Sequence, residues 1–244
     1  MVLTYAGRVR RWSGFIPYLV IGVVHLAALA SGAEWLSTPT KLLLMPALLL
    51  ALLVGLPRRR TMTALWASLA VLFSWAGDVL LATPGGIGFI LGLGLFALAH
   101  AAYVALFLGP IREHGIPRLA YLYAPWWLAL VFTLAPYAGS LLVPVAIYGL
   151  VLGLSAATAM GSNRMVVVGG LLFLLSDTVL AFKLFFPDFS LWQPDVGIML
   201  GYITGQGLII AGAVLHARRA HSAGSPHNGA MSPHTSPGST SQEW

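Results

Sequence analysis

The sequence lacks cysteine altogether, and it has very few charged residues. Without cysteine the chain can form no disulfide, no thiolate metal site and no cysteine nucleophile, and cysteine usage leaves its redox compartment open. Charged residues make up 8% of the chain and hydrophobic residues 58%, whereas a soluble domain carries roughly 25% charged residues. Because so few charged side chains cannot cover a core of this size in water, we expect lipid to be the solvent.

Several signatures of soluble enzymes and of nucleic-acid binding are also missing. The chain contains no HExxH, GxSxG, Walker or CxxC motif. Its net charge is +6, but the basic residues form short clusters between apolar runs, which is typical of topology signals that face anionic lipid headgroups. We therefore expect membrane lipid, and not nucleic acid, as a partner. No pattern indicates a metal site or an oligomeric state.

Long apolar runs dominate what is present. A membrane-spanning helix needs about 20 mostly apolar residues, and the first run is too long for a signal peptide and has no clear cleavage site after it. We predict an all-α polytopic membrane protein with about eight transmembrane helices. The predicted spans are Phe15–Ser31, Lys41–Leu56, Met62–Ala82, Ile87–Leu108, Leu119–Pro136, Leu141–Met160, Met165–Phe186 and Val196–His216.

The positions of the basic residues predict the orientation of these spans. Cytoplasmic loops of membrane proteins are enriched in arginine and lysine. With eight spans, every arginine falls on one side: Arg8, Arg10, Arg11, Arg58, Arg59, Arg60, Arg112, Arg118, Arg164, Arg218 and Arg219. We therefore predict a multi-pass protein of the plasma membrane with both termini in the cytoplasm. Residues 1–219 would form the transmembrane domain, and the Ser-, Pro-, Gly- and His-rich residues 220–244 a disordered cytoplasmic tail.

Two spans carry similar sequences around an aspartate. Phe73–Leu81 in the third span resembles Phe173–Leu180 in the seventh, and both spans run in the same direction. A parallel duplication of four helices would produce this similarity. Coincidence within an apolar alphabet is the alternative explanation.

A few ionisable or polar residues lie inside the spans, where they are costly and usually face the protein interior. Their depth follows from their distance to the nearest arginine at 1.5 Å per residue. A central layer lies about 18–21 Å from the arginines: His25, His100, Asp177 and Gln206. An outer layer lies about 26–29 Å away: Lys41, Asp78 and Lys183. Tyr202, at about 24 Å, falls between the two layers. We expect a polar cavity that is entered from the non-cytoplasmic side or from the outer leaflet.

The ordered set of these residues resembles the YhhN family, whose characterised members are lysoplasmalogenases. In the first half, Gly77-Asp78 is followed by Gly92, Phe96, His100 and Tyr103. The second half adds Gly169–Phe173, Ser176-Asp177, Leu180-Ala181, Tyr202 and Gly205-Gln206. Thr40-Lys41 with Met45-Pro46 is similar to the family's lysine–proline segment, although Leu42 stands where proline is more common. The resemblance covers roughly Lys41 to Leu215.

The resemblance implies hydrolysis of the vinyl ether bond of a lysophospholipid, the lysoplasmalogen, without a metal or organic cofactor. This reaction needs a protonated carboxyl and a negative group that stabilises the resulting cation. Burial favours the neutral form of a carboxyl and a nearby cation favours the ionised form. We expect Asp177 to be the general acid and Asp78, level with Lys41, to stay ionised, although the two roles could be exchanged.

Other residues are expected to assist these two acids. His100 would act with the acids in catalysis, and His100 and Gln206 would hydrogen-bond the water or the acid. Lys41 or Lys183 would hold the substrate phosphate, and Tyr103, Tyr202 and Gln206 would contact the substrate. Two alternatives stay open: a transporter or channel that uses both aspartates as a proton or cation relay, and a b-type haem protein ligated by His25 and His100.

Overall fold

The computed structural model describes residues 12–83 and 86–223. These residues form long α-helices joined by short turns and 3₁₀ segments, and they contain no strand. The all-α prediction is therefore confirmed. The helices are α2 (Ile16–Ala30), α3 (Glu34–Gly55), α4 (Met62–Leu81), α5 (Gly86–Leu108), α6 (Tyr123–Ala138), α7 (Leu142–Ala159), α8 (Arg164–Phe185) and α9 (Pro194–Ala223).

Seven helical stretches among the described residues are long and apolar enough to cross a membrane, so the chain is an integral multi-pass membrane protein. One of these stretches, Arg118–Ala159, contains both α6 and α7. The two helices fold back on each other at Gly139, whose φ of +51° is a conformation that glycine adopts without strain. Separate crossings by α6 and α7, and the side on which the termini lie, stay predictions.

Two helices extend beyond the predicted spans. Helix α3 begins at Glu34, not at Lys41, and the whole of Glu34–Gly55 is apolar enough to cross a membrane. Helix α9 continues past His216 to Ala223, and so through the boundary predicted at residue 219. The rest of the predicted tail, and the first arginine cluster, lie outside the described residues.

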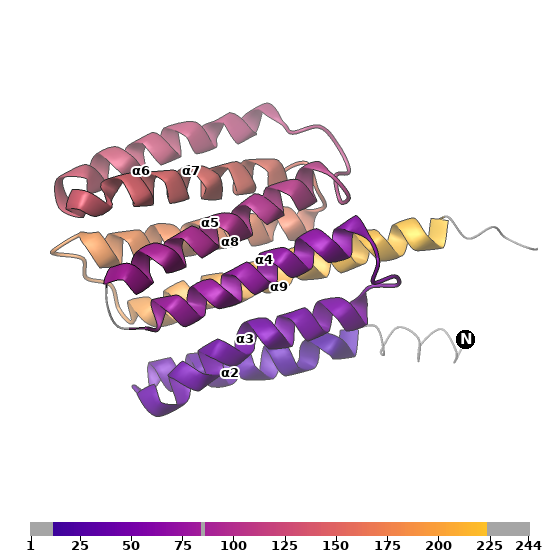
Figure 1. Ribbon diagram of the computed structural model, residues 1–244, viewed down its shortest axis with the longest axis horizontal. Coiled ribbons are helices and arrows are strands. Elements are labelled where there is room, and N and C mark those ends of the chain that lie inside the picture. Colours follow the sequence, from indigo (N-terminus) through magenta and orange to yellow (C-terminus); the bar gives the residue numbers. More distant parts are fainter. Residues whose placement is uncertain (1–11, 84–85, 224–244) are drawn as a thin grey trace, which may run out of the picture.

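The helices form two outer hairpins with four helices between them (Figure 1). The pair α2 and α3 packs on one flank, and the pair α6 and α7 on the other. Between them α4 packs along α5, and α8 along α9. Helix α9 also contacts α2, α3 and α4, which brings the end of the chain against its beginning.

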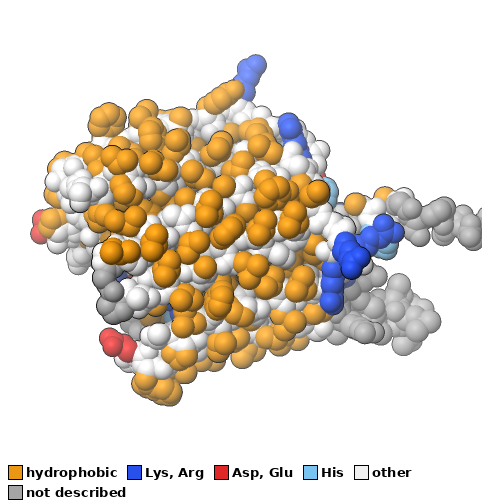
Figure 2. Space-filling view, in the orientation of Figure 1, with side chains coloured by type: hydrophobic (Ala, Val, Ile, Leu, Met, Phe, Trp, Pro, Cys, Tyr) orange, Lys and Arg blue, Asp and Glu red, His pale blue; other side chains and the backbone are white. Residues whose placement is uncertain are grey.

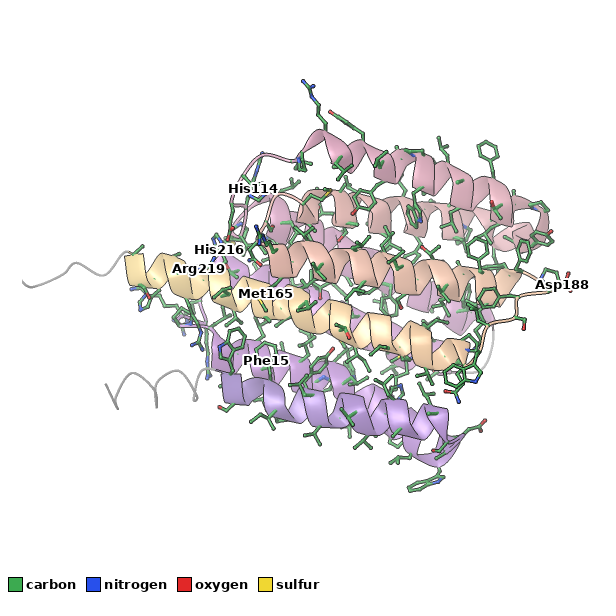
Figure 3. All side chains as sticks on the ribbon, turned by 180° about the vertical axis from the view of Figure 1, so that it is seen from behind. Phe15, His114, Met165, Asp188, His216 and Arg219 are labelled. Atoms are coloured by element: carbon green, nitrogen blue, oxygen red, sulfur yellow. The ribbon has the colours of Figure 1, made fainter. Side chains whose placement is uncertain are left out.

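Charged side chains separate to the two ends of the bundle. On the face shown in Figure 2, most basic side chains gather at one end and acidic side chains at the other, with a broad hydrophobic surface between them. Figure 3, seen from behind, places His114, His216 and Arg219 at the first end, which we call the arginine end, and Asp188 at the opposite end, which we call the far end. The described arginines thus share one end, as the predicted topology requires.

The surface between the two ends is built to face hydrocarbon. Large apolar side chains on the outer helix faces are exposed, among them Val23 at 68% and Phe132 at 74%. Side chains on the inner faces, such as Leu48 and Leu52, are fully buried. Exposed apolar surface is unfavourable in water at about 25 cal/mol per Å², and lipid removes that penalty.

A proline in α3 creates a link to α4. Pro46 has no N–H, so the carbonyl of Leu42, one turn earlier, loses its partner within the helix. The indole Nε1 of Trp75 on α4 donates to this carbonyl at 3.0 Å. The bond fixes α4 against α3 one residue after Lys41.

The two aspartate-bearing helices each pack closely against a glycine of the next helix. A Cβ on Gly77 of α4 would lie 3.2 Å from the carbonyl oxygen of Gly92 on α5 and even closer to the ring of Phe96. A Cβ on Gly201 of α9 would lie 3.0 Å from that of Ser176 on α8. In both pairs the residue just before the aspartate makes the contact. Whether the two halves arose by duplication stays a prediction.

Candidate active site

A cavity of about 380 Å³ opens among the helices in the half of the bundle nearer the far end. Its wall includes the last turns of α2, α4 and α8 and the first turns of α3, α5 and α9. The side chains that line it are mostly apolar: Leu29, Leu42, Leu81, Phe89, Leu93, Phe96, Val145, Leu180, Leu184, Phe185, Ile198 and Met199. Polar side chains interrupt this wall at a few points, as expected of a small-molecule site.

Asp78 lies on the wall beside a lysine and a tyrosine. Its Oδ1 is 3.4 Å from Nζ of Lys41 on α3, and the side chains are 4% and 30% exposed respectively. The hydroxyl of Tyr202 on α9 donates to Oδ2 of Asp78 at 2.8 Å. The predicted proximity of Lys41 and Asp78 is thus observed, and both carboxylate oxygens have partners that favour the ionised form.

Asp177 lies on the same cavity wall with different partners. The hydroxyl of Tyr148 on α7 donates to its Oδ2, and Asp177 forms no ion pair within the described part of the chain. Nε2 of His100 is 3.5 Å from the Tyr148 hydroxyl. The imidazole packs edge-on against Phe173, with ring centroids 4.6 Å apart. His100 is buried behind Tyr148 and does not itself line the cavity.

Tyr103 and Gln206, predicted to contact the substrate, lie in a buried layer outside the cavity wall. The Tyr103 hydroxyl donates to Oε1 of Gln206. Nε2 of Gln206 donates to Oγ of Ser74 at 3.0 Å, and Ser74 is one turn before Asp78 on α4. Both the oxygen and the nitrogen of the Gln206 amide therefore have hydrogen-bond partners within the protein. This arrangement is better suited to holding α4 in place than to contacting a ligand.

Lys183 also lies outside the cavity wall. It forms an ion pair with Asp195 at the start of α9, and Asp195 belongs to the rim of the cavity. The two side chains are 34% and 57% exposed. Lys183 thus ties α8 to α9 near the far end, while Lys41 is the basic residue on the described wall of the cavity.

His25 on α2, which was predicted in the central polar layer, is a member of the cavity wall. It is 1% exposed, and its Nδ1 is 3.0 Å from Oγ1 of Thr40 on α3. Its other ring nitrogen, Nε2, has no hydrogen-bond partner in the described part of the chain. A buried polar atom without a protein partner is uncommon and calls for an explanation.

Tyr148 is the site residue that sequence reasoning missed. The depth estimate that located the ionisable groups places it about 24 Å from Arg164, at 1.5 Å per residue. Tyr202, which was identified, lies at the same estimated depth. Applying the estimate to every tyrosine inside a span would have identified both hydroxyls that bond the two aspartates.

Comparison with known proteins agrees with this architecture. The model of the YhhN family matches residues 36–213, which begin just after the start of α3 and end within α9. Helix α2 lies outside the matched segment. No curated protein and no solved structure matches the chain. Because the family model covers most of the sequence, including both aspartates, the chain belongs to the YhhN family of lysoplasmalogenase-like membrane proteins.

Proposed function

We propose that the protein is a membrane-embedded hydrolase that cleaves the vinyl ether bond of lysoplasmalogens. One observation carries the proposal: two carboxyl groups from separate helices line one cavity, and their partners differ. Asp78 lies beside the cation of Lys41, whereas Asp177 accepts a hydrogen bond from the neutral hydroxyl of Tyr148. Pairs of acids in unlike surroundings are typical of sites where one acid donates a proton and the other stays charged.

The reaction begins with proton transfer to carbon. Asp177 in its neutral form gives its proton to the β-carbon of the vinyl ether, and the double-bond electrons form the new C–H bond. The α-carbon becomes an oxocarbenium ion, which is stabilised by its ether oxygen. Water adds to this carbon and returns a proton to the Asp177 carboxylate. The hemiacetal then breaks its bond to the glycerol oxygen, which takes up the hydroxyl proton, and yields a fatty aldehyde and a glycerophospho-alcohol.

Asp78 is suited to stabilise the intermediate cation. Its carboxylate is held in place by Lys41 and Tyr202, so little reorganisation is needed when positive charge develops nearby. Lys41 is partly exposed to the cavity and remains available to the substrate phosphate. The largely apolar wall suits the alkenyl chain of a lipid.

The buried layers below the cavity favour a hydrolase over a relay. A transporter or channel needs a polar path that continues toward the arginine end. Below the Tyr103–Gln206 layer, the described core is mostly apolar and includes Leu52, Phe107 and Ile210, each at 0% exposure. Its buried polar side chains are hydroxyls and one amide, with no buried acid or base among them: Thr63, Ser155, Thr158, Ser162 and Asn163. The haem alternative is also disfavoured, because His25 lines the cavity and His100 does not.

Aldehyde release tests the proposal directly. The purified full-length protein in detergent is incubated with a lysoplasmalogen, and free fatty aldehyde is measured over time. A lysolipid with a saturated ether at carbon 1 is the matched control, because it has no double bond to protonate. We expect aldehyde from the first lipid only. No release from lysoplasmalogens of any headgroup would refute the proposed function.

A further inference from the structure

His25 and Thr40 form a buried pair whose hydrogen positions can be worked out. The Thr40 hydroxyl has a single proton, and its Oγ1 lies 2.6 Å from the carbonyl oxygen of Leu36 and 3.0 Å from that of Ser37. The proton is therefore used within α3, and Oγ1 can only accept from Nδ1 of His25 at 3.0 Å. Neutral His25 thus carries its proton on Nδ1 and a free lone pair on Nε2.

This lone pair is a buried hydrogen-bond acceptor on a residue that lines the cavity. The ring lines the cavity, Nδ1 is turned to Thr40, and Nε2 has no partner among the described residues. A buried acceptor left unpaired is unfavourable by about 1–3 kcal/mol. The cavity contents are therefore expected to supply a donor, such as an N–H or O–H group.

The nearby Lys41 cation indicates which kind of molecule would carry the group that donates to Nε2 of His25. Lys41 follows Thr40, the partner of His25, on α3, and both His25 and Lys41 line the cavity, so the acceptor and the cation belong to one site. A hydroxyl group one carbon away from a phosphate ester fits this combination. In a lysolipid, the free hydroxyl at carbon 2 of the glycerol stands next to the phosphorylated carbon 3.

Resting on the proposed function, we propose that Nε2 of His25 accepts a hydrogen bond from the free 2-hydroxyl of the lysolipid glycerol. His25 is then a specificity-determining residue, supplied by a helix that the family match does not include. A site built to hydrogen-bond a hydroxyl discriminates strongly against an analogue that lacks it, because the protein's own polar group is left unpaired. A substrate acylated at this position would also lose the bond.

Binding of two saturated ether lipids tests this assignment without any hydrolysis. One is a 1-O-alkyl lysophospholipid, and the other is its 2-deoxy analogue, which removes the hydroxyl and adds no bulk. Their dissociation constants are measured on full-length protein in detergent. We expect the wild type to bind the hydroxylated lipid at least about tenfold more tightly, as the loss of a buried hydrogen bond implies. Equal affinities would overturn the proposal and assign Nε2 to water.

Substitutions then show which residue is responsible for the difference in affinity between the two lipids. His25→Phe keeps a planar ring without nitrogens, and should bring the two affinities within about twofold of each other. His114→Phe, at an exposed histidine of the arginine end, should keep the wild-type ratio. If His25→Phe does not fold, Thr40→Val makes the same test, because it removes the hydroxyl that accepts from Nδ1–H of His25. Thr40→Ser keeps that hydroxyl, so it should keep the wild-type ratio of the two dissociation constants. A wild-type ratio that survives His25→Phe, or Thr40→Val in its place, would overturn the proposal.

The tautomer has its own spectroscopic signature. In NMR spectra of ¹⁵N-histidine-labelled wild-type protein at neutral pH, we expect the Nε2 resonance of His25 in the range of an unprotonated ring nitrogen. Its Nδ1 resonance should fall in the range of a protonated one. The opposite tautomer would make Nε2 a donor and overturn the assignment. Failure of the proposed function is a separate result, since it appears as absent aldehyde release whatever the two lipid affinities are.

Discussion

Tyr148 donates a hydrogen bond to Asp177 from the neighbouring helix α7. The carboxyl group has no ion pair in the described part of the chain, so this hydroxyl is the contact that orients it. The equivalent contact of Asp78, from Tyr202, comes with a lysine as well. The difference in charge between the two surroundings is the basis for dividing the catalytic roles.

Tyr148→Phe should lower the rate of vinyl ether hydrolysis while the protein stays folded. The substitution removes one hydrogen bond of about 1–2 kcal/mol from the proton donor, which corresponds to roughly 5- to 30-fold in kcat. Steady-state aldehyde release measures the effect. Tyr121→Phe is the matched control because Tyr121 is 78% exposed, and its rate should equal that of wild type. If Tyr148→Phe hydrolysed the substrate as fast as Tyr121→Phe, the Tyr148 hydroxyl would have no role in the reaction.

The ion pair of Lys41 and Asp78 should be strongly coupled. Lys41→Met leaves a buried carboxylate without its cation and should destabilise the protein more than Lys41→Met combined with Asp78→Asn. We expect a coupling free energy of about 1–3 kcal/mol in a double-mutant cycle, measured by reversible unfolding in detergent. The exposed pair of Lys183 and Asp195 is the control, with a coupling of about 0–1 kcal/mol. Additive effects at Lys41 and Asp78 would contradict a direct interaction.

The sequence was sufficient to predict the helices and the approximate depth of each polar group. Lys41 and Asp78 were expected at one level, and they lie 3.4 Å apart. Depth along a helix follows from residue number, because each residue adds a fixed rise. The rotation of a helix about its axis cannot be obtained in this way, and this rotation decides which side chains face the cavity. For this reason His100 and Gln206 were predicted at a suitable depth but lie behind the cavity wall.

Rotation and spacing are set by contacts between distant segments. The bond from Trp75 to the Leu42 carbonyl and the close approach of Gly77 to Gly92 are examples. Neither pair can be identified from one sequence, since many tryptophans and glycines in an apolar chain could make such contacts. Tyr148 was missed for another reason: the depth estimate was not applied to it, because a tyrosine inside a span has several ordinary explanations.

The glycines of α9 should differ sharply in their tolerance of a methyl group. A Cβ on Gly205 would lie 2.8 Å from the carbonyl oxygen of Gly169, whereas a Cβ on Gly197 would meet nothing within 4 Å. We expect Gly205→Ala to destabilise the fold by about 1–3 kcal/mol and Gly197→Ala to be neutral or stabilising by up to about 1 kcal/mol. Thermal unfolding of both variants in one detergent checks this. Similar effects would show that α8 and α9 are not in close contact at Gly205.

Single introduced cysteines can test the topology, because the native chain has none. Ser140→Cys lies in the turn between α6 and α7, Ser31→Cys follows α2, and Arg219→Cys lies at the arginine end. In sealed cells a membrane-impermeant thiol reagent should label the first two and leave the third unlabelled. Labelling of Ser31→Cys without Ser140→Cys would mean that α6 and α7 do not cross separately. Labelling of Arg219→Cys alone would reverse the predicted orientation.

Asp177→Asn is the sharpest test of the mechanism. The amide keeps the size of the side chain and can still accept from Tyr148, but it has no acidic proton to transfer. Hydrolysis should therefore fall about 10²- to 10⁴-fold, the usual contribution of a general acid. Stability should hold, because a neutral amide replaces a neutral carboxyl of the same size, and both can be buried with a hydrogen-bond partner.

The partner substitution separates the two acids. Asp78→Asn should also slow hydrolysis, but through weaker stabilisation of the cation. Since proton transfer from Asp177 remains possible, a solvent deuterium isotope effect on kcat should persist in Asp78→Asn. Rates are compared at equal amounts of folded protein, judged by size-exclusion chromatography. Asp177→Asn activity within a factor of ten of wild type would exclude Asp177 as the proton donor. If in addition Asp78→Asn were inactive, the proton donor would be Asp78, and the roles of the two carboxyls would be exchanged.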